Sequence, residues 1–295
     1  MDIKGPFSYS GNKFRIWNKH LKDFFSSYDF IYEPFSGSAV CLYNSKKGGI
    51  ASDVDPIVVS LHNSLKDSNL PDRMLSCYNQ YFPQGRTKEG FYKLRNDFNK
   101  TYLLEGATKN NIHQLHLLVQ LCFNSLLRFS STGFNSPYGM KDVDIERIRL
   151  HCKIVSKKSI EVLNISYKDF PLDKIDSKGI FYFDPPYAAS KFQYGGWNKQ
   201  NEIDLLSFID KLNEKNIPFV LSNTFSHRGE VNQELIDWSK SYTVCPIKMS
   251  YNSWAAGVPS VEREDGTIEV IITNVPGADF KPGEKVESKK SNQIF

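Results

Sequence analysis

Short apolar runs alternate along this chain with segments whose apolar residues recur at helical spacing. Runs of β-branched and aromatic residues predict strands, and amphipathic stretches predict helices between them. Strands are expected near Ile31 and over residues 49–53, 159–163, 179–183, 219–223, 242–244 and 268–273, and helices over 56–65, 201–216 and 234–238. The last strand is expected to pair antiparallel with a strand near Lys248. In the helix over 201–216, the residues expected to face inward are Ile203, Leu206, Ile209 and Leu212. This alternation predicts an α/β fold.

The pattern changes between residues 66 and 153, where polar helical segments carry a broken apolar face. Residues 115–123 are apolar enough for a buried helix, whereas residues 123–141 are rich in Ser, Asn, Gly and aromatic side chains. The latter stretch predicts a loop or hairpin with apolar tips, and taken alone it is an ordinary surface hairpin. We therefore expect residues 66–153 to form a domain inserted into an α/β domain of residues 1–65 and 154–275, and residues 276–295 to form a flexible tail.

Composition and charge permit a nucleic-acid partner without requiring one. The net charge of +4 is small for 295 residues, so a local basic patch matters more than the total. The five cysteines are scattered and form no Cys-x-x-Cys pair, which indicates reduced thiols and no metal site. No long apolar run opens the chain, so we expect a cytoplasmic protein without a signal peptide or membrane span.

The stretch Phe181–Tyr187 carries the strongest chemical signal. An apolar strand ends at Asp184, because the prolines that follow cannot donate hydrogen bonds to a sheet. A carboxylate there lies where open α/β sheets bind ligands. The Asp184 carboxylate and the Pro185 carbonyl can each accept one N–H of an exocyclic amine, which frees the nitrogen lone pair for attack. Tyr187 offers a flat face on which a flipped base can stack. The alternative is a strand and a proline turn without chemistry.

A strand–turn–helix–strand unit near the N-terminus predicts a cofactor site. The strand near Ile31 runs into the turn Phe35–Ser38, whose small residues let the backbone approach a ligand closely. Asp53 ends the next strand at the spacing by which such folds place a carboxylate on ribose hydroxyls. Because the glycine pattern is not G-x-G-x-x-G, the unit suits S-adenosylmethionine better than NAD. A structural unit without a cofactor is the alternative.

Three further positions fit a ligand in this context. Lys13 opens a helix, where the dipole disfavours a lone cation, so a ligand carboxylate is a fitting partner and a solvated lysine the alternative. Asp169 and Phe170 could hold an adenine ring by hydrogen bonding and stacking, or Asp169 could be a helix cap. Residues 188–197 are aromatic and contain glycine, which suits a lid over the site.

Several short motifs follow one another between residues 9 and 223. They are Tyr9–Lys13, Glu33–Ser38, Asp53, Phe91–Arg95, Arg128–Lys141, Asp184–Tyr187 and Leu221–Asn223. The order, with cofactor motifs first, a recognition block next and the catalytic motif last, resembles the α group of amino-methyltransferases. The chain is similar to the D12 class, Dam-type (GATC) DNA adenine-N6 methyltransferases of the phage-encoded branch. This resemblance covers residues 5 to about 273.

The resemblance implies a Rossmann-like S-adenosylmethionine-dependent methyltransferase fold with an inserted, mostly helical target-recognition domain that bears a hairpin loop. Its implied catalytic residues are Asp184, Pro185, Pro186 and Tyr187. Its implied cofactor contacts are Tyr9, Gly11, Asn12, Lys13, Phe35, Ser36, Gly37, Ser38, Asp53, Asp169 and Phe170. Its implied contacts to double-stranded DNA are Arg95, Asn124, Ser125, Leu126, Arg128, Ser130, Asn135, Pro137, Tyr138 and Lys141. Arg128 matches the arginine that reads a guanine of GATC, and Leu126 falls in the wedge region.

The chain departs from the family pattern at two places. Its cofactor turn reads Phe-Ser-Gly-Ser, where relatives often read Phe-x-Gly-Gly or Phe-x-Gly-Ser, and serine in place of glycine adds little bulk. Met140 and Lys141 stand where relatives commonly place an arginine, and a lysine cannot repeat the bidentate fork of an arginine. GATC is therefore the leading target rather than the only one.

The sequence predicts methyl transfer from S-adenosylmethionine to the N6 amine of a flipped adenine in duplex DNA, with no obligatory protein partner. Two alternatives stay open. One is an amine methyltransferase that acts on cytosine N4, RNA or protein, and the other is a DNA-binding relative without catalysis. Restriction-modification, phage and housekeeping roles are not distinguished by the sequence.

Overall fold

A mixed sheet forms the centre of the molecule. The computed structural model describes residues 2–9, 11–187, 196–227, 230–247, 268–278 and 280. Within these residues the strand order is β5-β2-β1-β6-β7-β10-β9, and β8 pairs with β7. The strands are β1 (Phe30–Tyr32), β2 (Gly48–Ser52), β5 (Ser159–Leu163), β6 (Gly179–Phe183), β7 (Phe219–His227), β8 (Glu230–Val231), β9 (Thr243–Ile247) and β10 (Ile268–Thr273).

Strands β5, β2, β1, β6 and β7 are parallel to one another, whereas β10 is antiparallel to both β7 and β9. Parallel neighbours need long crossover connections, and here helices supply them. The predicted α/β, Rossmann-like fold is confirmed, as is the antiparallel pairing of the last strand. Residues 248–267, which include the predicted Lys248 end of that pairing, lie outside the described residues.

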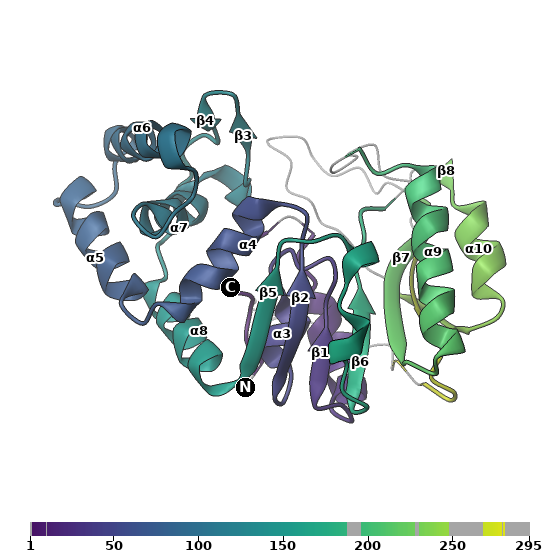
Figure 1. Ribbon diagram of the computed structural model, residues 1–295. Helices are drawn as coiled ribbons and strands as arrows, with labels where there is room; N and C mark the ends of the chain where they lie inside the picture. Colours follow the sequence, from purple (N-terminus) through teal and green to yellow (C-terminus); the bar gives the residue numbers. More distant parts are fainter. Residues whose placement is uncertain are drawn as a thin grey trace, which may run out of the picture.

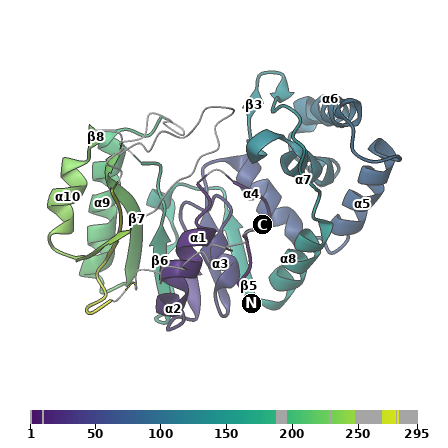
Figure 2. The same ribbon diagram turned by 180° about the vertical axis from the view of Figure 1, so that it is seen from behind.

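Side chains alternate between the two faces of β6, the strand next to β1 at the middle of the sheet. Ile180 and Tyr182 pack with apolar side chains of the N-terminal helices, whereas Phe181 and Phe183 pack with those of α9. Figure 2 shows α1, α2 and α3 in front of the sheet, and Figure 1 shows α9 in front of the opposite face. These helical elements are α1 (Phe14–Ile16), the π-helix η1 (Trp17–Leu21), α2 (Lys22–Phe25), α3 (Val40–Asn44), α9 (Lys199–Glu214) and α10 (Gln233–Ser239).

A helical lobe lies beside the β5 edge of the sheet, on the side away from α10 (Figures 1 and 2). It contains α5 (Leu70–Tyr81), α6 (Lys88–Glu105), α7 (Ile112–Leu121), α8 (Ile145–Lys157) and a two-stranded ribbon of β3 (Phe129–Ser130) and β4 (Gly133–Phe134). Its buried residues form one cluster with α3 and with α4 (Pro56–Asn63). The division of the chain into a catalytic domain and a recognition domain at residues 66 and 153 stays a prediction.

One sequence expectation about burial is wrong. Ile203 of α9 was expected to face inward, but it is 40% exposed and Leu205 is buried in its place. The flexible tail expected over residues 276–295 stays a prediction. Within its described part, Phe280 is buried and its ring lies 4.7 Å from that of Phe24. Residues 281–295 lie outside the described residues. In the described ranges no helix has both the length and the apolarity to cross a membrane.

Candidate active site

The candidate site lies where the chain changes direction across the sheet. β1 and β6 are parallel neighbours, and from them the chain adds β2 and β5 on one side and β7 on the other. The loops that leave the carboxyl ends of two such strands diverge, which opens a crevice for ligands at that edge. The turn Phe35–Ser38 follows β1, and Asp184 follows β6 directly. The fold therefore brings the predicted cofactor turn and the predicted catalytic motif to the same edge.

Asp184 is paired with Lys13. The Lys13 Nζ lies 2.8 Å from Asp184 Oδ1, and the exposed fractions of the two side chains are 11% and 18%. The same Nζ donates to the Gly11 carbonyl at 3.1 Å and lies 5.1 Å from the centre of the Tyr187 ring. Burial raises the pKa of Asp184, and the Lys13 cation opposes this rise. The sequence suggested a ligand carboxylate as the partner of Lys13; in the structure that partner is the catalytic candidate itself.

The residues after Asp184 are buried or partly buried. Pro185 is buried, and Pro186 and Tyr187 are partly buried. Burial and the nearby Asp184 carboxylate raise the pKa of the Tyr187 phenol, so its hydroxyl is neutral at physiological pH. The catalytic roles of these four residues stay predictions. Residues 188–195, most of the predicted lid, lie outside the described residues.

The turn after β1 is held by hydrogen bonds to its neighbours. Asp53 Oδ2 accepts from the Gly37 amide at 3.1 Å and from the Ser36 hydroxyl at 3.3 Å. The Ser38 hydroxyl accepts from the Asn12 side-chain amide at 3.1 Å. Burial raises the pKa of Asp53. The structure thus brings together five residues that the sequence assigned to the cofactor, and their contacts with it stay predictions.

Glu33 is a site residue that sequence reasoning did not single out. It precedes the turn, is 4% exposed, and its Oε2 accepts from the Leu42 amide at 2.9 Å. Burial raises the pKa of Glu33 to about 8. The carboxyl group therefore links the end of β1 to the first turn of α3. The sequence signal that could have indicated Glu33 is its position directly before a proline at the end of a buried strand.

Asp169 and Phe170 are placed differently from one another. Asp169 is exposed, whereas Phe170 is 4% exposed and packs edge-on against Tyr32 and Phe181, with ring centres 6.2 Å and 5.1 Å away. The Phe170 ring is thus almost fully buried, and its predicted stacking on the cofactor stays a prediction. The rings beside the cofactor turn are instead Tyr167 and Trp197, at 5.4 Å and 5.6 Å from the Phe35 ring. The sequence assigned neither ring to the cofactor, although Trp197 falls at the end of the predicted lid.

The predicted recognition block forms a braced ribbon. Arg128 is exposed, its Nε donates to Asn135 Oδ1 at 2.7 Å, and its terminal nitrogen donates to the Asn135 carbonyl at 3.1 Å. Lys141 Nζ donates to the Ser125 hydroxyl at 2.8 Å, and Arg95 donates to the Ser136 carbonyl at 3.3 Å. The ribbon lies at the top of Figure 1. The connection from β2 to α4 lies at the same end of the molecule.

Exposure separates the other members of that block. Asn124, Ser130 and Pro137 are exposed, whereas Leu126 and Tyr138 are partly buried and Ser125 is buried. The sequence placed Leu126 in the wedge region, and two other apolar residues of this block are more exposed: Phe123 at 52% and Met140 at 90%. The contacts of all these residues with DNA stay predictions.

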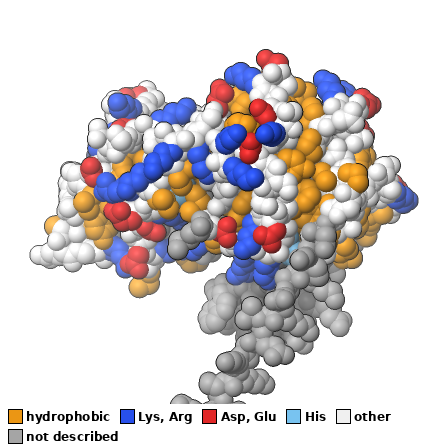
Figure 3. Space-filling model, turned by 90° about the horizontal axis from the view of Figure 1, so that it is seen from below, with side chains coloured by type: hydrophobic (Ala, Val, Ile, Leu, Met, Phe, Trp, Pro, Cys, Tyr) orange, Lys and Arg blue, Asp and Glu red, His pale blue; other side chains and the backbone are white. Residues whose placement is uncertain are grey.

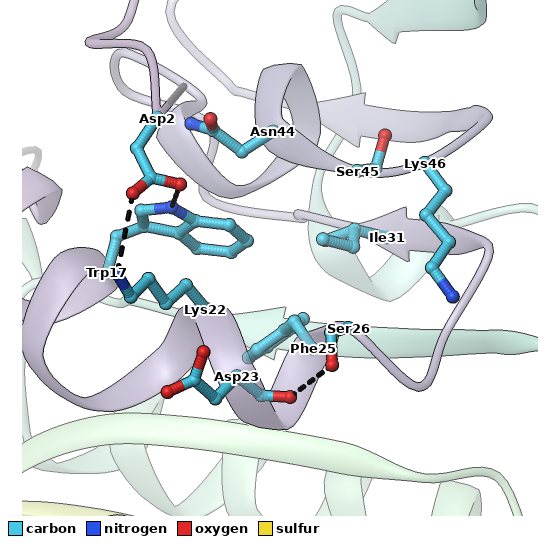
Figure 4. Close-up of a pocket in the computed structure, with 10 residues that line it drawn as sticks. All are labelled: Asp2, Trp17, Lys22, Asp23, Phe25, Ser26, Ile31, Asn44, Ser45 and Lys46. Carbon is cyan, nitrogen blue, oxygen red and sulfur yellow. Dashed lines mark hydrogen bonds and ion pairs between the residues drawn. The ribbon is translucent and has the colours of Figure 1, made fainter.

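A separate pocket of about 280 Å³ opens at the amino ends of the strands. Figure 4 shows the Trp17 indole in its wall, with Asp2 bonded to the indole nitrogen at 3.4 Å and Lys22 close by. Its charged lining residues are of both signs: Asp2, Lys22, Asp23 and Lys46. Acidic and basic side chains also lie among one another on the molecular face seen from below in Figure 3. Among the described residues, no three His, Cys, Asp or Glu side chains gather in a way that could hold a metal ion.

The fold and the site together define a Rossmann-like protein of the methyltransferase class: a mostly parallel sheet brings a small-residue turn and an Asp-Pro-Pro-Tyr motif to one edge. Comparison with known families gives the particular group. The sequence model of the D12 class N6 adenine-specific DNA methyltransferases matches residues 9–252, and the chain belongs to this family.

Three relatives illustrate the range of similarity. The chain is 28% identical over 289 residues to the type II methyltransferase M.FokI of Planomicrobium okeanokoites and 26% identical over 288 residues to the modification methylase StsI of Streptococcus sanguinis. Each alignment covers 92% of this chain but only 43% of the relative. The chain is also 26% identical over 311 residues to the type II methyltransferase M.MjaIII of Methanocaldococcus jannaschii, covering 93% of this chain and 100% of that protein.

Proposed function

We propose that the chain transfers a methyl group from S-adenosylmethionine to the N6 amine of adenine in double-stranded DNA. The observation that carries the proposal is the position of Asp184, at the carboxyl end of β6, ion-paired to Lys13 at 2.8 Å and beside the turn that follows β1. Membership of an adenine-specific DNA methyltransferase family supports it. Because the chain spans 43% of two of its relatives, the activity of the whole protein is part of the proposal.

The residues around the turn Phe35–Ser38 fit S-adenosylmethionine. Gly37 has φ +43°, in the left-handed region that favours glycine, and this brings the backbone close to the edge of the sheet. The Asp53 carboxylate lies at the end of β2, where it suits ribose hydroxyls. When bound, the cofactor supplies a sulfonium whose methyl group is already activated for transfer.

The protein's own residues would orient and polarise the adenine amine. Asp184 accepts one N–H of the amine and the Pro185 carbonyl accepts the other, which draws the nitrogen toward tetrahedral geometry and frees its lone pair. Both acceptors are fixed before the base arrives, because they follow a buried strand and lie within a proline pair. Tyr187 stacks on the base after it has been flipped out of the duplex, at a cost of roughly a few kcal/mol.

We further propose that residues 66–153 recognise the target, with GATC as the leading site and Arg128 as a guanine reader. An arginine that keeps its fork open can donate twice to the O6 and N7 of guanine. The guanidinium of Arg128 is exposed, and Asn135 fixes its orientation through two hydrogen bonds. A role in a cytoplasmic restriction-modification system suits the names of the relatives, since all three are methyltransferases or modification methylases.

The test is methyl transfer from labelled S-adenosylmethionine to unmethylated plasmid DNA, with the methylated positions read at base resolution. The matched variant is Asp184→Ala, which keeps the strand and the proline pair but removes the carboxylate. We expect it to lose about a hundredfold to a thousandfold in rate while retaining DNA binding, since one preorganised hydrogen-bonding group contributes at roughly this scale.

Each result decides a separate part of the proposal. N6-methyladenine confined to GATC supports the chemistry and the site, and shows that Lys141 serves without a neighbouring arginine. N6-methyladenine at another sequence keeps the chemistry and overturns GATC. Methylcytosine, or methyl transfer to RNA or protein only, overturns the adenine substrate. An Asp184→Ala variant that methylates at the wild-type rate overturns the mechanism.

A further inference from the structure

The peptide group of Gly37 is held on both sides by side chains from two other elements. Its amide donates to Asp53 Oδ2 at 3.1 Å, and its carbonyl accepts from His62 Nε2 at 2.9 Å. A side chain on Gly37 would have its Cβ 3.1 Å from the Tyr9 ring, so this backbone has little room to move on the third side. Asp53 belongs to the predicted cofactor site, whereas His62 lies behind the turn, in α4.

The hydrogen bonds of His62 leave its ring only one protonation pattern. A backbone carbonyl only accepts, so Nε2 carries the hydrogen that it donates to Gly37. Nδ1 of the neutral ring is then an acceptor, and it receives the Tyr43 hydroxyl at 2.9 Å. The two side chains are 2% and 0% exposed. Burial lowers the pKa of His62 to about 4, which keeps the ring neutral at physiological pH.

Aromatic rings and two further buried histidines, His116 and His151, lie near His62. The Phe7 ring lies 4.9 Å from the His62 ring, and the Tyr43 ring meets that of His151 in α8 edge-on at 4.9 Å. An apolar side chain would fill such a site without the desolvation of two ring nitrogens. The hydrogen bonds to Gly37 and Tyr43 offset that desolvation, and the only part of the candidate active site that they reach is the Gly37 carbonyl.

We propose that His62, oriented by Tyr43, is a positioning residue that fixes the Gly37 carbonyl and so keeps the turn Phe35–Ser38 in the shape that binds the cofactor. This inference rests on the proposed function, because it assumes that this turn holds S-adenosylmethionine. His62 itself touches neither substrate. It acts through the backbone of the turn, together with Asp53 on the amide side of the same peptide group.

The experiment compares His62→Leu with His62→Gln in the full chain. Leucine removes both hydrogen bonds, whereas the glutamine amide can donate to Gly37 and accept from Tyr43. The first readout is hydrogen exchange of the amides of residues 36–39 without cofactor. The second is S-adenosylmethionine affinity by calorimetry, and the third is the KM for DNA. We expect His62→Leu to raise the exchange rate of the turn amides and the cofactor Kd about tenfold each, as for one lost buried hydrogen bond. It should leave the KM for DNA unchanged. His62→Gln should bring both the exchange rate and the Kd most of the way back to the wild-type values.

His116→Leu is the matched control. His116 of α7 is 1% exposed, and its Nε2 lies 2.8 Å from the Ser64 hydroxyl. Its loss should lower stability while leaving turn exchange and cofactor affinity unchanged. If His62→Leu fails to fold, Tyr43→Phe carries the test, because it removes only the donor to Nδ1 and should raise turn exchange about threefold.

Unchanged turn exchange in folded His62→Leu overturns the positioning role. Raised exchange with wild-type cofactor affinity overturns the link between the turn and the cofactor. Equal losses in His62→Leu and His116→Leu show a general packing effect and overturn the proposal. If the wild-type chain does not bind S-adenosylmethionine, the proposed function fails, and the link to the cofactor with it, while hydrogen exchange still decides whether His62 positions the turn.

Discussion

At the scale of single residues, the pairing of Lys13 with Asp184 is the contact that most affects the chemistry. The two are 171 positions apart in the chain, yet their charged atoms lie 2.8 Å apart at the carboxyl edge of the sheet. Burial favours the protonated form of Asp184, which could accept an amine N–H less well, and the Lys13 cation favours the ionised form. Lys13 is therefore expected to keep the carboxylate in the state that the reaction needs.

Lys13→Met should move the acid limb of the pH–kcat profile to higher pH. Without the cation the pKa of Asp184 rises further, so the carboxylate becomes ionised only at higher pH, and the rate at neutral pH falls. The expected displacement is roughly 1–3 pH units, the usual effect of an adjacent opposite charge. The measurement is kcat against pH at saturating cofactor and DNA.

Lys13→Arg is the matched control for that profile, because it keeps a cation at the position. Its acid limb should stay near that of the wild type. An acid limb that is the same in the wild type and Lys13→Met, with only the KM for cofactor raised, would show that Lys13 serves the cofactor and not Asp184.

At the scale of elements, the ribbon of β3 and β4 presents Arg128 in a fixed orientation. Asn135, which directly follows β4, accepts from Arg128 through its side-chain oxygen at 2.7 Å and through its backbone carbonyl at 3.1 Å. The sequence assigned both residues to DNA without relating them. In the structure Asn135 acts as a brace for the arginine, so the two are expected to contribute to recognition as a unit.

Arg128→Ala should relax discrimination at one base pair of the target by about 1–3 kcal/mol, which is roughly 5- to 150-fold in kcat/KM. Asn135→Ala leaves the guanidinium in place but unbraced, so a smaller loss at the same base pair is expected. The measurement is kcat/KM on duplexes that carry each single-base change, for both variants and the double variant.

The double variant should lose little more than Arg128→Ala alone, because the brace has no function without the arginine. Ser131→Ala, at the exposed turn of the same ribbon, is the control and should match the wild type. A uniform loss across all duplexes would assign Arg128 to the phosphate backbone instead of a base.

At the scale of the whole molecule, the helical lobe shares one apolar cluster with the helices and strands that flank the cofactor turn. Buried residues of α5, α6, α7 and α8 belong to the same apolar cluster as residues of α3 and α4, which flank the cofactor turn. The predicted recognition domain is thus expected to unfold together with the cofactor-binding part of the chain. Cooperative unfolding follows from a continuous core, since neither part can lose its packing alone.

Leu118→Ala in the middle of α7 should destabilise the protein by about 2–5 kcal/mol, the usual effect of a large-to-small change in a core. Leu118 is fully buried. The measurement is urea unfolding followed by far-ultraviolet circular dichroism and by tryptophan fluorescence. Fluorescence reports only on the sheet side, because the four tryptophans lie outside residues 66–153, whereas circular dichroism also reports on the lobe. If the two parts unfold together, the two transitions should coincide.

Leu104→Ala, at a position that is 88% exposed, is the matched control and should change stability by less than about 0.5 kcal/mol. Two separate transitions, with only the circular dichroism signal displaced by Leu118→Ala, would show that the lobe unfolds independently of the sheet.

Much of the candidate site could be predicted because its residues lie in short motifs. Asp184 follows a recognisable strand and precedes two prolines, and Asp53 ends a second strand one helix after the small-residue turn. Burial was harder to predict. Phe170 was expected to stack on a ligand but packs in the core, and Ile203 was expected inside but is 40% exposed. Helical spacing gives the apolar stripe, whereas the exact width of its contact depends on the sheet beneath it.

The sequence by itself determined the order of strands and helices, the chemistry available at Asp184 and the family of the chain. These depend on local spacing and on residue types that follow one another. Only the tertiary structure decided that Lys13 faces Asp184, that Asn135 braces Arg128 and that His62 holds the Gly37 carbonyl. The first and third of these contacts join residues from separate elements, and the distance between them is set by how those elements pack, which no spacing along the chain records. The second depends on the register of the β3–β4 ribbon, in which Phe129 pairs with Phe134, and the sequence predicted a hairpin there without its register.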